Sequence, residues 1–208
     1  MENNDQTRRD FVRNLSISTV GVGALILPQR SYAAPGVDGN LNHIGPKEGY
    51  TPQIGTLISM LDWVSDSVIR YNAKLTVEQL DYLHDKDSNT IGSLMLHLAA
   101  TEVVYQDLTF NSLQDFAPAN KTKWQTAMEL GENARKEIKG QPLSYYKEAI
   151  DEVRAVTKAE MKKRDDKWLL SGETKEWDWN NYCKWFHVTE HYANHRGQMT
   201  WYAKRMPK

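Results

Sequence analysis

The sequence predicts an all-α protein, an antiparallel four-helix bundle with extra short helices in its connections. Four stretches place apolar residues at intervals of three and four, which is the spacing of a helix with one buried face. No stretch sustains the apolar–polar alternation of a β-strand, and no repeat of fixed length is visible. Helices joined by short or moderate links pack most simply as such a bundle.

Composition narrows the class of protein further. The chain has 208 residues, enough for one domain with a sizeable core. Its formal net charge is −1 and it has no long basic run, so we expect no nucleic-acid partner. A single cysteine, Cys183, excludes an intrachain disulfide framework and a cysteine-rich zinc site.

Residues 1–33 have the pattern of a secretory signal that is removed from the folded protein. An arginine pair, Arg8 and Arg9, precedes a mildly apolar run over residues 15–28, and the small residues that follow favour cleavage after Ala33. The pair resembles the twin-arginine signal. The alternatives are a buried N-terminal helix and an uncleaved anchor, but the run is shorter than the about 20 residues that cross a bilayer. We therefore expect export to the periplasm, with no stable membrane insertion after cleavage.

Residues 34–49 are rich in glycine and proline and are expected to form an extended linker to the helical domain, residues 50–208. The first helix is predicted to begin at Thr51 and Pro52, a cap followed by proline in the first turn, and to continue to about Tyr71. A short capped turn is predicted soon afterwards, at residues 76–80.

The second long helix is predicted to follow the cap at residues 87–90 and to continue past Tyr105. Residues 112–120, which include Pro118, are expected to connect it to a moderately helical stretch over residues 124–138. Gly140 and Pro142 then end that stretch.

The third long helix is predicted to be capped by Ser144 and to reach Met161, with the charged run at residues 158–166 as a solvated face. A loop that contains Trp177 and Trp179 leads into the last helix. That helix is expected to extend from Asn180 to about Arg205, where Pro207 stops it.

Three histidines spaced by four, His187, His191 and His195, lie on this last helix. A four-residue step returns nearly to the same face one turn further on, so two neighbouring imidazoles can bind one metal ion. All three cannot easily do so, because His187 and His195 lie about 12 Å apart along the axis. The helix therefore offers either His187 with His191 or His191 with His195, and a third ligand must come from elsewhere.

His97 is the best candidate for that third ligand. A histidine in an apolar helical stretch is more often a core residue than a ligand, but the pair on the last helix needs a buried partner. The other two histidines, His43 and His84, fall in polar, loop-like sequence, and His84 is expected to be a solvated surface residue.

Neighbouring side chains do not extend this ligand set. Glu102 follows His97 by five residues and points ~140° away from it on a helix. Cys183 lies about 12 Å before His191 along the axis and is interpreted as a small buried hydrophobe. Asn194 and Gln198 are spaced for a hydrogen bond to each other.

Two other classes of metal site are excluded by their motifs. A ferritin-like di-iron centre would need Glu-x-x-His motifs and a zincin protease would need His-Glu-x-x-His, and the sequence has neither.

Two motifs occur together: Ser-Asn-Thr-Ile-Gly-Ser-Leu at residues 88–94 with His97, and, about ninety residues later, the three histidines followed by Arg196-Gly197-Gln198. In this combination the chain resembles the DinB/YfiT-like family, from about residue 50 to about residue 205. The resemblance implies a four-helix bundle that binds a divalent metal through one histidine on the second helix and two on the last. Carried over, the ligands are His97, His191 and His195, and His187 becomes a core residue or a support for the ligands. Zinc or nickel is the metal that the family implies, with iron or manganese as alternatives.

The resemblance also implies a function. Some relatives resemble thiol S-transferases that act with low-molecular-weight thiols, and three nitrogens with an open position match a catalytic metal site. An exported enzyme would not meet the cytosolic thiol pools, so a hydrolase acting on a small molecule is kept as well. The alternative is a non-catalytic bundle in which the histidines form a structural metal clamp. A homodimer is the assembly to test for.

Four residues around the ligands are candidates for supporting roles. Glu190 is placed to orient an imidazole, and Arg196 either binds an anionic substrate or carboxylate or forms a surface ion pair. The others are His187 and Gln198.

Overall fold

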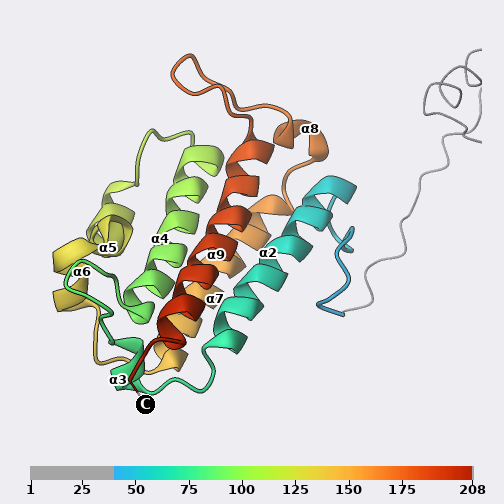
Figure 1. Cartoon of the computed structure of the whole chain (residues 1–208). Coiled ribbons are helices and arrows are strands. Elements are labelled where there is room, and N and C mark those ends of the chain that lie inside the picture. Colours follow the sequence, from blue (N-terminus) through green and yellow to red (C-terminus); the bar gives the residue numbers. More distant parts are fainter. Residues whose placement is uncertain (1–39, 208) are drawn as a thin grey trace, which may run out of the picture. The chain divides into compact units, whose positions relative to one another are not determined.

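The computed structural model describes residues 40–207, and within this range the chain is helical with no strand (Figure 1). The predicted signal, residues 1–33, lies outside the described residues. Four long helices form the bundle, which confirms the predicted all-α bundle: α2 (Pro52–Tyr71), α4 (Ile91–Phe110), α7 (Leu143–Met161) and α9 (Asn181–Ala203).

Two of the long helices run one way and two the other. α2 and α9 are parallel, because Ser67 contacts Arg196 while Asn72, further along α2, contacts Met199 further along α9. α4 and α7 run together in the opposite direction (Figure 1). α4 packs against α7 and α9, and α7 packs against α4 and α2. The seam between α4 and α9 is therefore antiparallel.

The parallel pair α4 and α7 needs a connection that returns along the bundle. That connection contains α5 (Pro118–Glu129), which packs against α4, and α6 (Gly131–Glu137), which packs against α5. Shorter helices, α3 (Val77–Leu80) and α8 (Asp166–Leu169), lie in the other links. α3 matches the predicted capped turn, since the Thr76 side chain and Gln79 cap each other reciprocally.

Three predicted boundaries are wrong. Residues 118–120 belong to α5 rather than to a loop, because a proline lacks the N–H that the first helical turn leaves unpaired. The stretch predicted over residues 124–138 is two helices, separated where Leu130 and Gly131 have φ of 59° and 71°. α7 begins at Leu143 with Pro142 as its cap, two residues before the predicted cap Ser144.

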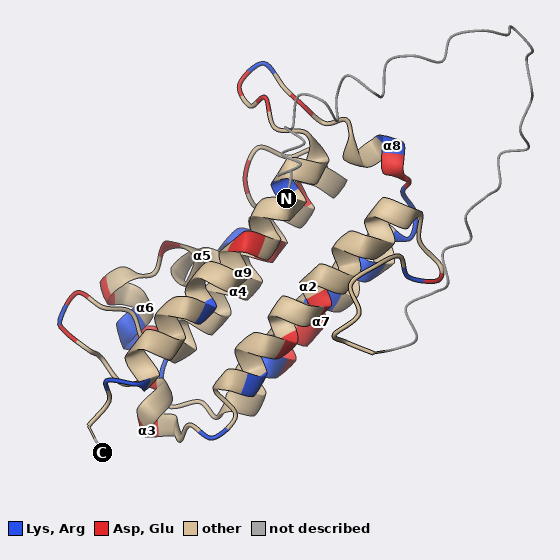
Figure 2. Cartoon of the chain, turned by 45° about the vertical axis from the view of Figure 1, so that its right-hand side comes forward, with Lys and Arg blue, Asp and Glu red and all other residues tan. Residues whose placement is uncertain are grey.

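α4 is the central element of the bundle. Of its 20 residues, 18 are buried, so it has no broad solvent-facing side. The other long helices each keep an exposed face, and Lys, Arg, Asp and Glu residues are interspersed along them (Figure 2). Among the described helices none combines the length and apolar character needed to cross a membrane.

Candidate metal centre

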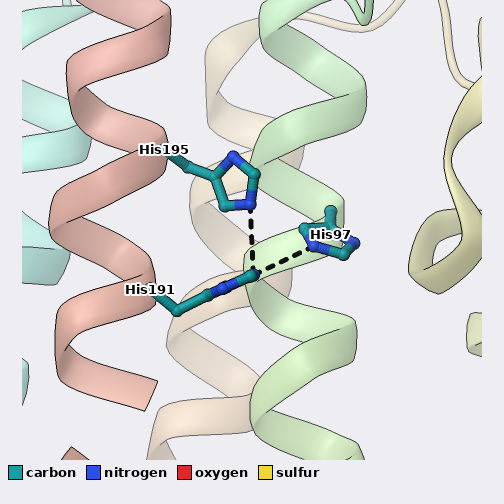
Figure 3. A group of neighbouring side chains, drawn as sticks. All are labelled: His97, His191 and His195. Carbon is teal, nitrogen blue, oxygen red and sulfur yellow. Dashed lines mark hydrogen bonds between the residues drawn. The ribbon is translucent and has the colours of Figure 1, made fainter. Parts of the chain in front are cut away.

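Three histidine side chains converge where α4 meets α9 (Figure 3). His97 comes from α4, and His191 and His195 come from successive turns of α9. The Nε2 atom of His191 lies 3.0 Å from Nε2 of His97 and 3.1 Å from Nε2 of His195. Of the two pairs that the last helix offers, the structure thus brings His191 and His195 together with His97.

The outer nitrogens of two of these rings are held by hydrogen bonds. His97 donates through Nδ1 to the backbone carbonyl of Ala127 in α5, at 3.0 Å. His195 donates through Nδ1 to Oε1 of Gln198, at 2.8 Å. A carbonyl oxygen only accepts, so both rings carry their proton on Nδ1 and turn an Nε2 lone pair toward His191.

This arrangement fits a metal ion. Nitrogen ligands bind zinc at roughly 2.0–2.1 Å, which puts two ligands about 3–3.4 Å apart at right-angle to tetrahedral geometry. A cation would also receive all three Nε2 lone pairs, whereas a single ring proton on His191 can be shared with only one neighbour. In the described part of the chain the cluster consists of these three residues, without a cysteine or carboxylate. Three protein ligands leave a coordination position for another molecule.

Burial keeps the three imidazoles uncharged. It lowers the pKa of His97 to about 4 and that of His191 to about 3, and the neighbouring His195 contributes in both cases. The pKa of His195 is lowered as well, again by burial. Neutral imidazole is the form that binds metal, so at neutral pH a metal ion need not displace protons from the site.

Two contacts at the centre were not foreseen from the sequence. Thr101, one turn after His97, donates its hydroxyl to the His97 carbonyl at 2.8 Å and places Oγ1 3.4 Å from Nε2 of His191. Thr101 could have been found from the sequence, because a residue four positions after His97 lies on the same face of the helix. The carbonyl of Ala127 carried no signal, because its position depends on how α5 packs against α4.

Of the predicted supporting residues, Gln198 is the one that contacts a ligand. The predicted bond between Asn194 and Gln198 is not formed, since the Gln198 oxygen binds His195 and Asn194 is exposed. Glu190 is also exposed and pairs with His187, whose Nδ1 lies 3.1 Å from its carboxylate. The ring of His187 lies 5.5 Å from that of His191, beside the cluster but outside it.

Arg196 points toward α2 rather than toward the histidines, and among the described residues it forms no ion pair with a carboxylate. Its guanidinium donates to Ser67 Oγ on α2 at 2.9 Å and lies 5.1 Å from the ring of Trp63. Arg196 therefore joins α2 to α9.

The expectation for His84 is also corrected. It is half-buried rather than solvated, because the Trp201 ring of α9 packs 4.6 Å away. His43 is exposed, as expected of a loop residue, and Cys183 is half-buried rather than fully buried. Glu102 takes no part in the histidine cluster, as its offset from His97 predicts, and its side chain is fully buried.

A cavity of about 530 Å³ lies beside Gln198. Its walls come from the segment before α4 and the C-terminal half of α9, and they include His84, Asp85, Asn194, Gln198, Trp201 and Tyr202. The cavity is large enough for a small organic molecule and combines aromatic with hydrogen-bonding side chains. Gln198 links it to the ligand His195.

A family model described as mycothiol-S-transferase matches residues 56–201, a span that contains the three histidines and Gln198. The search of curated proteins found no match.

Proposed function

We propose, because the chain belongs to the mycothiol-S-transferase family, that it is a metal-dependent enzyme that transfers the sulfur of a low-molecular-weight thiol to an electrophilic substrate. The observation that carries the metal dependence is the convergence of three neutral Nε2 atoms from His97, His191 and His195. The absence of a fourth protein ligand from this cluster, within residues 40–207, favours a catalytic site over a structural clamp.

The residues of the chain have defined tasks in such a reaction. A divalent ion bound by the three histidines would lower the pKa of a thiol and so favour its thiolate at neutral pH. Ala127 and Gln198 orient two of the ligands. In the transfer, the thiol proton is released to solvent, the sulfur forms a bond to the electrophilic carbon, and the leaving group departs with the electron pair of the broken bond. The cavity beside Gln198 would hold the body of one reactant.

Metal content and transferase activity test this proposal together. The purified protein should hold about one divalent ion per chain, as a single three-histidine site implies. His97→Ala, His191→Ala and His195→Ala should each lose most of the metal and the metal-dependent consumption of thiol in the presence of an activated aryl halide. Elemental analysis and a free-thiol assay give the two readouts.

His187→Ala is the matched control, because His187 pairs with Glu190 and lies outside the cluster. It should keep the metal. If His187→Ala empties the site while His195→Ala does not, the assignment of the ligands is wrong. Full metal content with no transfer of any thiol would leave the metal site standing and remove the transferase proposal.

We also propose that the protein is exported through the twin-arginine route, on the pattern of residues 1–33. An exported enzyme meets thiols other than those of the cytosol, so the activity assay should sample several of them. Arg8→Lys combined with Arg9→Lys should retain the precursor in the cytoplasm, because that route reads the arginine pair. Arg13→Lys, outside the pair, is the control in the same cell-fractionation assay. Normal periplasmic accumulation of the double variant would contradict the twin-arginine route.

A further inference from the structure

The position of α4 within the bundle poses a packing problem. Helices with one apolar stripe are oriented by burying it, but 18 of the 20 residues of α4 are buried. Apolar contacts on all sides do not by themselves fix how far such a helix is rotated or how far it slides along its axis. A slide by one residue is about 1.5 Å, whereas metal–ligand distances tolerate about 0.2 Å. Directional contacts are therefore needed beside His97.

Glu102 of α4 provides such contacts from the centre of the bundle. Its side chain is fully buried and accepts hydrogen bonds from two nitrogens of Arg154 on α7, Nε and Nη2, both at 2.8 Å. Thr157, also on α7, donates to the same carboxylate at 2.6 Å. The Tyr192 hydroxyl of α9 donates to its second oxygen at 3.2 Å. One carboxylate thus joins three helices.

The Tyr192 bond lies directly beside the metal centre. Tyr192 follows the ligand His191 in α9, and Glu102 follows Thr101, whose hydroxyl lies 3.4 Å from Nε2 of His191. His97, one turn before Thr101, completes the same stretch of the α4–α9 seam (Figure 3). A further hydrogen bond on this seam, from Trp185 to Thr109, lies nearer the other end of α4.

Stability alone does not account for this network. A buried ion pair is often no more stabilising than apolar residues of the same shape, because both charges lose their hydration. The best-attested role of such buried polar groups is to select one register between helices. Here the register in question is the one that brings the ligands of α4 and α9 together.

We infer that Tyr192, through its hydrogen bond to Glu102, is a positioning residue that sets the register of α4 against α9 and so preorganises the three-histidine site. The inference rests on the proposed metal binding and adds a residue whose hydroxyl bonds to Glu102 rather than to a ligand nitrogen. It concerns the affinity and geometry of the site, and it holds whichever reaction the enzyme catalyses.

Tyr192→Phe is the test variant, because it removes only the hydroxyl and leaves the pair of Glu102 and Arg154 intact. Tyr146→Phe is the matched control. Tyr146 is also fully buried, and its hydroxyl has no hydrogen-bond partner within the described residues. Zinc affinity, measured by competition with a chromogenic chelator, should fall about tenfold in Tyr192→Phe, which is the lower end of the effect of residues that orient metal ligands. Tyr146→Phe should match the unmodified protein.

A second readout separates positioning from general destabilisation. The visible spectrum of the cobalt-substituted protein reports ligand geometry and should change in Tyr192→Phe but not in Tyr146→Phe, at a temperature where circular dichroism shows equal helical content. An unchanged affinity and spectrum in Tyr192→Phe, with only a lower melting temperature, would overturn the inference and leave the proposed function intact. An unmodified protein that binds no metal would overturn both.

Discussion

The imidazole of His195 has two nitrogens, and only one of them faces the other histidines. The second donates to Gln198, which fixes both the tautomer and the orientation of the ring. His97 is held in the same way, but by a backbone carbonyl that no substitution removes. Gln198 is therefore the supporting contact of the metal centre that mutagenesis can address most directly.

Gln198→Ala is expected to lower zinc affinity about 10- to 100-fold, the usual effect of removing the partner of a metal-binding histidine. Gln198→Glu should retain most of the affinity, because a carboxylate also accepts from the ring N–H. Competition with a chelator measures both variants. Asn194→Ala is the control, since Asn194 is exposed on the same helix. Equal losses in the Gln198→Ala and Asn194→Ala variants would show that the hydrogen bond to His195 does not support the ligand.

At the residue scale, the sequence predicted which residues could bind a metal better than it predicted which side chains contact each other. The four-residue spacing limited the α9 ligands to two pairs, and the family resemblance selected His191 and His195. The orientations of Arg196 and His84 were not predictable, because their partners Ser67 and Trp201 come from helices distant in the sequence. A local pattern contains no information about which remote helix covers a side chain.

At the scale of elements, the accuracy of a predicted boundary follows the strength of its local signal. α2, α4 and α9 begin where a capping residue precedes an apolar periodic stretch, and these boundaries were predicted closely. The division between α5 and α6 was missed, because it depends on a positive φ at Leu130, a residue type that rarely adopts one. The α5 carbonyl that holds His97 was missed for a different reason, because its position depends on how α5 packs against α4.

The close contact between α4 and α7 depends on the glycine at position 92. A Cβ atom at Gly92 would lie 2.5 Å from the Tyr146 hydroxyl oxygen, so a residue with a side chain would separate the two helices. The sequence marks Gly92 within a family motif, but its partner comes from a helix about fifty residues later. The resemblance thus indicated a position whose physical role only the packing explains.

At the scale of the whole molecule, the bundle separates two tasks. Its interior contains an apolar core and the network around Glu102, which joins α4, α7 and α9. The metal centre lies toward the outer side of the α4–α9 seam, where α5 and the cavity beside Gln198 adjoin it. We therefore expect the fold not to depend on metal binding by the histidines, whereas a structural zinc clamp would be needed for folding.

This separation predicts what happens when the metal is removed. A bundle of this size should bury enough apolar surface to fold without metal, so chelation should abolish thiol transfer while the circular dichroism spectrum keeps its helical form. The melting temperature should fall only by the amount that ligand binding to the native state contributes. In the cobalt-substituted protein, addition of a small thiol or azide should change the visible spectrum, because the three-histidine site leaves a coordination position for it. Cooperative unfolding on chelation, together with a cobalt spectrum that ignores added ligands, would instead identify the site as a structural clamp and remove the enzymatic proposal.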